Sequence, residues 1–314
     1  MLITILKRLA ASIPVLVVVA VVIFSILRLT PGDPAAIVAG DGATVQQIEQ
    51  IRHHMGLDQP ITVQFYRWIR DILHGDFGTS LISGLPVSNM ILDRMGPTIA
   101  ITLYTILYTL LISIPAGIIA AWRRGRAADK VVTLASVLGF SVPVFITAYI
   151  LIFIFSMGLG WLPVQGYKPL RAGVWQHAQY MILPVASLST IYIALITRFV
   201  RSGVIDTLGE DYIRTARAKG LAERAVLIHH ALPNAAVPIL TIIGISITML
   251  IGGVVVTESV FNIPGLGRLA VEAIQAKDFT IIQSLIILFS VVDIVVNLVI
   301  DILYRVVDPR IDYS

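Results

Sequence analysis

The chain has 314 residues, of which 57% are hydrophobic and only 13% are charged, and its mean hydropathy is +0.88. A soluble globular domain is about 45–50% apolar and about 25% charged, so this composition excludes a soluble enzyme. The formal charge is +4 and no cysteine is present, which excludes disulfides, thiolate metal sites and cysteine nucleophiles.

Six apolar stretches predict membrane-spanning helices, because each supplies about the 20 residues that cross ~30 Å of hydrocarbon. The expected spans are residues 9–29, 98–122, 131–157, 179–198, 236–257 and 281–303. The first span is longer than the core of about 7–15 residues in a signal peptide, and no small-x-small cleavage site follows it. We therefore expect an uncleaved helix and an all-α, polytopic membrane protein with six transmembrane helices.

Prolines fall inside four of these spans, at positions 14, 115, 143 and 184. Each removes a backbone donor, so local bends are expected, and in membrane helices the neighbouring helices satisfy the freed carbonyl groups. Ordinary kinks in a packed bundle are the favoured interpretation. The best candidate for a functional hinge is the sequence Gly139-Phe140-Ser141-Val142-Pro143.

The orientation of the spans follows from the distribution of Lys and Arg near their ends. One set of connections is rich in basic residues, namely Lys7, Arg8, Arg123, Arg124, Arg126, Lys130, Arg198, Arg201, Arg214, Arg217, Lys219, Arg224, Arg305 and Arg310. The opposite set spreads fewer basic residues over a much longer stretch of chain. The sequence therefore predicts that both termini lie in the cytoplasm.

Three parts of the chain are expected to have different roles. Residues 1–30 form an N-terminal transmembrane helix, and residues 31–96 form an outward-facing helical segment. Residues 97–314 form a five-helix core that carries a cytoplasmic connection at 205–234. This connection is called the elbow below.

The outward segment is predicted to contain two helices. Thr44-Val45-Gln46-Gln47 has the spacing of a capping box and predicts a helix over 45–55, stopped by Gly56. A second helix runs from about Pro60 to Leu73, with apolar side chains recurring at helical spacing. A small folded cap is the favoured interpretation, and a docking surface for an external partner is the functional alternative.

The elbow is predicted to be two short helices with a bend at Gly220, because glycine readily takes the left-handed conformation that closes a helix. Glu223 lies in the first turn of the second helix, where its charge suits the helix dipole, whereas Ala222 is a poor N-cap. Tyr212 and Leu221 offer apolar anchors to another surface. A short rigid bend that is joined directly to two spans could transmit a mechanical force to both of them.

The elbow resembles the cytoplasmic "EAA" loop of permease subunits of ABC importers, written E-A-A-x-x-x-G-x9-I-x-L-P. Gly220 and Leu232-Pro233 match it, whereas the triplet falls on Arg214-Thr215-Ala216 and His230 replaces the isoleucine. The form Asp211-Tyr212-Ile213-Arg214-Thr215-Ala216-Arg217-Ala218-Lys219-Gly220 resembles the dipeptide/oligopeptide/nickel permease family, in its DppB/OppB-like branch. Further signatures of that family are LTPGDP at 29–34, GLDQP at 56–60, GDFGTS at 75–80, VFNIPGLG at 260–267 and DPR at 308–310.

The resemblance, which covers the whole chain, implies a type I ABC importer permease fold in a bacterial or archaeal cytoplasmic membrane. It implies four further partners: a second, similar permease, two cytoplasmic ATPase subunits and an external substrate-binding protein. ATP and Mg would bind in the ATPases, and this chain contains no G-x-x-x-x-G-K-[ST] phosphate loop. The cargo is expected to be dipeptides or oligopeptides, with nickel, glutathione or opines as alternatives.

The resemblance also implies which residues of the elbow contact an ATPase. The residues expected to couple to that subunit are Tyr212, Ala216, Ala218, Lys219, Gly220, Leu221, Ala222 and Glu223.

Polar residues inside the sixth span form a second candidate site. Asp293, Asn297 and Asp301 recur every four residues and so share one helix face, and Glu258 lies near the outer end of the fifth span. An acid at mid-bilayer costs about 2.5–3.5 kcal/mol, so this face should turn away from lipid. An interhelical tie is slightly favoured over a wall of the translocation pathway.

Two other classes compete with a driven permease. An intramembrane enzyme is disfavoured, because no H-E-x-x-H or G-x-S-x-G motif occurs and all six histidines are expected outside the spans, the adjacent pairs 53–54 and 229–230 as solvated helix residues. The six are His53, His54, His74, His177, His229 and His230. A proton-coupled secondary transporter could use Asp293 and Asp301, but it would not need the elbow.

Overall fold

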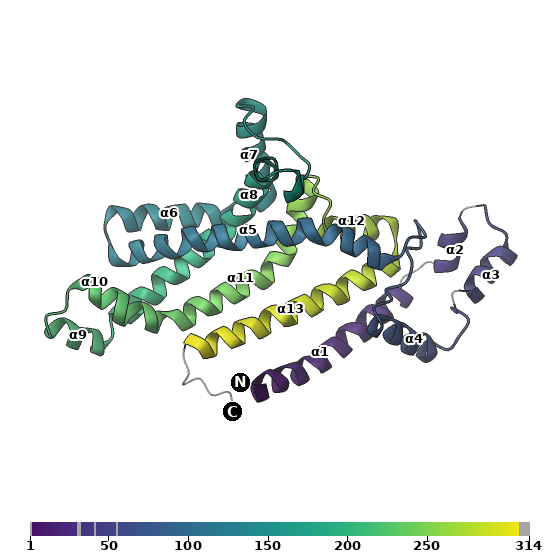
Figure 1. Ribbon diagram of the computed structural model, residues 1–314, viewed down its shortest axis with the longest axis horizontal. Helices are drawn as coiled ribbons and strands as arrows, with labels where there is room; N and C mark the ends of the chain where they lie inside the picture. The colour runs from purple at the N-terminus through teal and green to yellow at the C-terminus, as the bar shows by residue number, and fades with distance from the viewer. Residues whose placement is uncertain (1, 30–32, 41, 55, 308–314) are drawn as a thin grey trace. The chain divides into compact units, whose positions relative to one another are not determined.

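The computed structural model describes residues 2–29, 33–40, 42–54 and 56–307. Within these ranges the regular structure is helical, apart from one isolated β-bridge between Thr79 and Pro86 (Figure 1). The chain forms two compact units: residues 1–96 with 268–294, and residues 97–267 with 295–314. The expectation of an all-α fold is confirmed.

The first unit begins with four helices, α1 (Leu2–Leu29), α2 (Pro34–Ala39), α3 (Val45–His54) and α4 (Ile61–Leu73). The predicted capping box is present: the Thr44 backbone N–H donates to Gln47 Oε1 at 2.8 Å, and the Gln47 N–H donates to Thr44 Oγ1 at 3.3 Å. Asp33 caps α2 and forms an ion pair with Arg52 of α3 at 2.5 Å. Residues 30–32 of the LTPGDP signature lie outside the described residues.

The apolar face predicted on the second outward helix packs against the first span. The ring of Phe24 on α1 lies edge-on to Phe65 of α4, with ring centroids 5.2 Å apart, and 5.7 Å from Trp68. Ile61 remains 64% exposed at the start of α4. The face is therefore only partly covered within this unit.

The GDFGTS signature forms a turn that is tied to the start of the last long helix, α13 (Phe279–Val307). Ser80 Oγ donates to Asp278 Oδ2 at 2.5 Å, and Asp278 Oδ1 accepts from the Ile281 N–H at 3.3 Å, so the buried Asp278 caps α13. Ser284 Oγ reaches the Phe77 carbonyl oxygen at 3.4 Å. Ser80, Asp278 and Ser284 are buried polar residues, and these hydrogen bonds between the turn and the start of α13 satisfy them.

The second unit contains the long helices α5 (Val87–Trp122, from residue 97), α8 (Val174–Leu208) and α11 (Leu232–Val260). Between α5 and α8 lie α6 (Ala127–Ser141), α7 (Val144–Leu151), the π-helical η1 (Ile152–Gly158) and the 3-10 turn η2 (Leu170–Ala172). The elbow forms α9 (Asp211–Ala218), α10 (Glu223–Ala225) and the π-helical η3 (Val226–Ala231). The helix α12 (Leu266–Ala276) begins within the last two residues of the VFNIPGLG signature.

The helix α8 is the centre of the second unit. It packs against α11, α6 and α7, and it contains buried polar residues as well as apolar ones, among them Ser187, Ser189 and Thr197. Small side chains allow close approach, since an added Cβ at Gly117 of α5 would lie 2.6 Å from Val200 Cβ. Small and hydroxyl residues at helix contacts are typical of membrane bundles.

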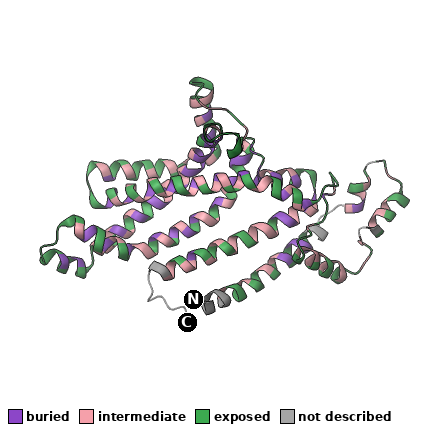
Figure 2. Cartoon of the chain, in the orientation of Figure 1, coloured by how far each residue is buried: buried purple, intermediate pink, exposed green. Residues whose placement is uncertain are grey.

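In the described part of the chain, five helices are long and apolar enough to cross a membrane, and a sixth span results if the bent pair α6 and α7–η1 counts as one. Each of the six predicted spans falls within one of these segments. Exposed residues recur along every long helix (Figure 2). Many of them are large and apolar, such as Val18 of α1 at 60% and Met249 of α11 at 57% exposed, which suits a lipid surface.

The third predicted span, 131–157, is not one continuous helix: it is broken near Pro143, where the sequence predicts a bend. The helix α6 ends at Ser141 and α7 starts at Val144, and the two meet at an angle of 103°. Pro143 has no N–H and disfavours helical geometry at Val142, which is extended (ψ 122°). Pro14, Pro115 and Pro184 lie inside continuous helices instead.

The VFNIPGLG loop is built around the buried carboxyl group of Glu258 at the end of α11. Glu258 is fully buried and accepts a hydrogen bond from Thr98 Oγ1 at 2.6 Å, and Thr98 Oγ1 accepts from the Leu266 N–H at 2.8 Å. A Cβ on Gly265 would lie 2.0 Å from Glu258 Oε1, and one on Gly267 would lie 2.6 Å from Val255 Cα. Gly265 and Gly267 are therefore required because any larger residue would collide with Glu258 or with the backbone of α11.

A Gly267→Ala variant is expected to lose about 1–3 kcal/mol of stability, because the added methyl meets backbone that cannot move aside cheaply. Gly252→Ala, on the neighbouring helix α11, is the control, since nothing lies within 4 Å of its Cβ position. That control should be neutral or slightly stabilising. Thermal unfolding in detergent distinguishes them, and equal melting temperatures would contradict the described packing.

Candidate functional site

The elbow has the bent geometry predicted from the sequence. The helix α9 ends at Ala218, and Gly220 adopts a left-handed φ of +81° with nothing within 4 Å of its Cβ position. Across the bend, Arg217 Nε and Nη2 donate to the two carboxylate oxygens of Glu223 at 2.8 and 3.1 Å. A two-pronged contact of this kind fixes the angle between the two short helices.

The elbow is packed into the same core as the ends of α8 and α11. Ile213 and Ala216 of α9 and Val226 of η3 are buried in a cluster with Val200 and Val204 of α8. The cluster also takes in Ala121 of α5 and Ala235, Ile239 and Ile242 of α11. Because close-packed interiors transmit strain, a force on the elbow reaches both helices.

The two predicted apolar anchors, Tyr212 and Leu221, lie on the exposed surface of the elbow. Tyr212 is 42% and Leu221 is 41% exposed, and Ala218, Lys219, Ala222 and Glu223 are exposed as well. Partial burial and the nearby charge of Glu210 raise the pKa of the Tyr212 phenol, so it stays a neutral hydrogen-bond donor. Ala216 differs from the other predicted coupling residues, because it is buried within the elbow and supports its packing.

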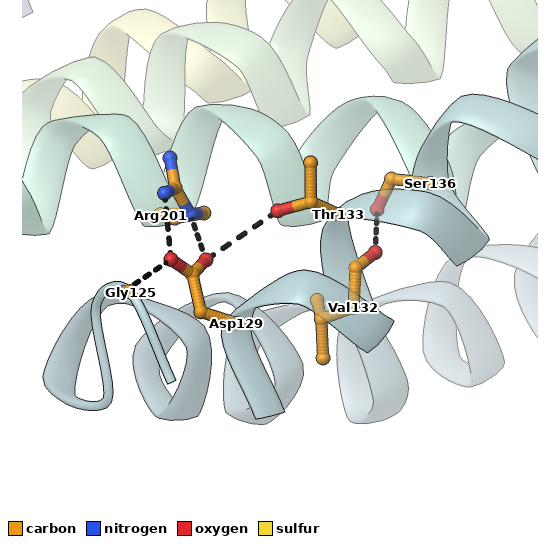
Figure 3. A network of polar contacts seen from close by, with 6 residues as sticks. All are labelled: Gly125, Asp129, Val132, Thr133, Ser136 and Arg201. Carbon is orange, nitrogen blue, oxygen red and sulfur yellow. Dashed lines mark hydrogen bonds and ion pairs between the residues drawn. The ribbon is translucent and has the colours of Figure 1, made fainter. Parts of the chain in front are cut away.

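A buried ion pair with supporting hydrogen bonds connects the turn between α5 and α6 to α8 (Figure 3). Asp129 is 5% exposed and accepts from Arg201 Nε at 2.5 Å and Nη2 at 3.0 Å. It also accepts from the Gly125 N–H at 2.8 Å and from Thr133 Oγ1 at 3.4 Å. In the sequence Arg201 stands out only as a basic residue near the end of a span, and no local pattern marks Asp129.

A groove follows α8 along one side. Three hollows of about 370, 390 and 470 Å³ lie along it, between α8 and helices α5, α6 and α7. The middle hollow shares Tyr108 and Ala186 with one neighbour and Ser136, Ala194 and Thr197 with the other, so the three form one trough, here called the α8 groove. Its lining extends from Val174 to Arg201, ~40 Å along a helix.

One end of the α8 groove carries a buried histidine. His177 is 3% exposed and lies on α8, within the candidate span Val174–Leu208, so the expectation that it lies outside the spans is wrong. Its Nδ1 lies 2.6 Å from the Lys168 carbonyl oxygen, and its Nε2 lies 3.1 Å from the hydroxyl oxygen of Tyr104. The helix α8 begins five residues before the expected span, which accounts for the error.

The predicted membrane acids are not among the residues that line the α8 groove. Asp293, Asn297 and Asp301 are on α13, where both acids are partly exposed and Asn297 is exposed, whereas Glu258 belongs to the loop core described above. The signature Asp308-Pro309-Arg310 lies outside the described residues.

The fold and the elbow define an all-helical membrane permease, and comparison with known proteins gives its family. Residues 113–313 match the family model described as "Binding-protein-dependent transport system inner membrane component", and residues 1–102 match the model of its N-terminal part. The chain belongs to this family, and it is therefore a multi-pass inner-membrane permease of a binding-protein-dependent ABC importer. It is a non-catalytic transport component that works with ATPase and binding-protein partners.

Relatives match over nearly the whole length. The chain is 47% identical to the "Probable peptide ABC transporter permease protein y4tP" of Sinorhizobium fredii, covering 98% of this chain and 99% of the relative. It is 44% identical to the "Glutathione transport system permease protein GsiC" of Salmonella typhimurium and 42% identical to GsiC of Escherichia coli K12, with 99% of both chains covered in each case.

The fold has a solved counterpart. A chain of the MetNI methionine ABC transporter in an inward-facing conformation matches with a TM-score of 0.57 at 18% identity, covering 69% of this chain and 96% of that chain. At this identity the likeness supports the ABC importer permease fold.

Proposed function

We propose that this chain forms half of the translocation pathway of an ATP-driven importer of dipeptides and oligopeptides. The other half is a second, similar permease, and two ATPase subunits bind ATP and Mg and drive the pair. The single observation that carries the proposal is the rigid elbow, which shares one buried core with two membrane helices.

The α8 groove supports the assignment of half a pathway. It extends over ~40 Å, more than the ~30 Å of a bilayer core, and its hydroxyl and aromatic side chains are interspersed among apolar ones. A trough open on one side becomes a channel when a second permease covers it. The break at Val142-Pro143 borders this trough, and we infer that it serves as a hinge.

The elbow is the proposed contact with an ATPase. Tyr212 and Leu221 supply the apolar anchors, and Ala218, Lys219, Ala222 and Glu223 form the surface around them. Gly220 sets the bend and Ala216 packs beneath it. Closure of the ATPases would move the elbow and, through the shared core, α8 and α11.

The orientation and the outer segment complete the proposal. Both termini and the elbow lie in the cytoplasm, as the distribution of basic residues favours. Residues 31–96 then face outward, and the incompletely covered face of α4 supports a contact with the binding protein. Asp293, Asn297 and Asp301 act as interhelical ties. Glu258 acts as a tie as well, which the hydrogen bond that it accepts from Thr98 of α5 supports.

Peptide cargo is tested with the importer reconstituted in vesicles together with its permease partner, ATPases and binding protein. Labelled Ala-Phe dipeptide is expected to accumulate only when ATP and the binding protein are both present, and collapse of the proton gradient should have no effect. Glutathione, an opine and Ni²⁺ serve as competing cargoes. Uptake of Ni²⁺ or an opine with no uptake of Ala-Phe would overturn the peptide assignment.

A further inference from the structure

The contacts of His177 determine which of its ring nitrogens carries a proton. A carbonyl oxygen can only accept a hydrogen bond, so the 2.6 Å contact with the Lys168 oxygen requires a hydrogen on Nδ1. In the neutral imidazole, Nε2 is then the acceptor. The rings of Tyr104 and Tyr167 lie edge-on to His177, with centroids 5.6 and 5.7 Å away, and hold it in this orientation.

The state of His177 in turn fixes the role of Tyr104. Because Nε2 accepts, the Tyr104 hydroxyl donates its only hydrogen to it across 3.1 Å. The phenolic oxygen keeps lone pairs but has no hydrogen left to donate. Tyr104 and His177 both line the α8 groove, and within the described part of the chain the hydroxyl has no other hydrogen-bond partner.

The surroundings of this oxygen are otherwise apolar. The same hollow of about 470 Å³ is lined by Leu107, Leu111, Met181, Ile182 and Val185. A polar atom of a molecule passing here has few partners, so a hydrogen bond to Tyr104 contributes more than it does in water. That atom must be a donor, since the phenolic oxygen can only accept.

We propose that Tyr104, oriented by His177, is a specificity-determining residue that accepts a hydrogen bond from N–H groups of the cargo, foremost the α-ammonium group of a peptide. This inference rests on the proposed peptide function. It assigns to the groove a preference for cargo that presents a hydrogen-bond donor, in addition to any selection by the binding protein.

The test uses the complete reconstituted importer and labelled Ala-Phe. A Tyr104→Phe variant is expected to lower the ATP-driven uptake rate about tenfold, the effect of losing one hydrogen bond to a charged group. Tyr108→Phe is the matched control, because Tyr108 lines the same groove and has no hydrogen bond through its hydroxyl within the described residues. That control should stay within twofold of the unaltered complex, and stimulation of the ATPase by loaded binding protein should persist in both.

A second pair of variants covers the case in which Tyr104→Phe does not assemble. His177→Gln keeps one donor and one acceptor and should retain uptake within twofold, whereas His177→Leu frees the Tyr104 hydrogen and should lower uptake about threefold. Normal uptake by Tyr104→Phe, an equal loss in Tyr108→Phe, or equal effects of the two His177 variants would overturn the inference. Absence of Ala-Phe uptake by the unaltered complex would instead refute the proposed peptide function.

Discussion

A Gly220→Val variant is expected to lower ATP-driven uptake at least tenfold while the permease still accumulates in the membrane. Gly220 has φ +81°, a conformation that a β-branched residue strongly disfavours, and nothing lies within 4 Å of its Cβ position. The damage is therefore to the backbone angle of the elbow and not to packing. Changing that angle also separates Arg217 from Glu223, which now join across the bend.

The control for this variant is Gly125→Val. Gly125 has φ +78° and equally open surroundings, but it lies in the turn between α5 and α6. Both variants carry comparable backbone strain, so comparable thermal stability with transport lost only in Gly220→Val is the expected pattern. Equal transport in the two variants would show that the bend at Gly220 has no special role in coupling.

An Asp129→Leu variant is expected to lower the free energy of unfolding by about 2–3 kcal/mol. Removing one partner of a buried ion pair typically costs about 3–5 kcal/mol, and the Arg201 side chain keeps 29% exposure, which reduces the loss. The Gly125 N–H also loses its acceptor. For a chain of this size such a loss should lower the melting temperature by about 3–5 °C.

The double variant Asp129→Leu/Arg201→Leu separates the pair from its surroundings. It removes both charges together and should recover most of the lost stability, because no unpaired charge remains next to the core. Thermal unfolding of the unaltered protein, both single variants and the double variant in the same detergent is the measurement. A double variant as unstable as the sum of its parts would show that Asp129 and Arg201 are not coupled.

Sequence patterns predicted the helices well wherever local chemistry decides the structure. The capping box at Thr44 and Gln47, the stop at Gly56 and the bend at Gly220 depend on side chains or φ angles within a few residues. The apolar stretches likewise located each span, because the bilayer sets their minimum length. Family membership, inferred from short motifs, was confirmed over the full chain.

Features that depend on distant partners could not be predicted. Asp129 and Arg201 are 72 residues apart, and His177 and Tyr104 are 73 apart, so no local pattern joins them. The 103° angle after α6 shows the same limit: Pro143 predicted a bend, but its size is set by the packing of α6 and α7 on α8. The burial of Ala216 also follows from packing with η3 and not from its sequence neighbours.

Crosslinking from the elbow to the ATPase tests the central claim most directly. The chain has no cysteine, so a single Leu221→Cys variant carries one reactive thiol, and Ile245→Cys, at an exposed position of α11 far from the elbow in sequence, is the control. In membranes that contain the transport-active complex, a thiol-reactive photocrosslinker at position 221 should attach to an ATPase subunit, and one at position 245 should not. A transport-active complex in which position 221 never reaches the ATPase would contradict the account.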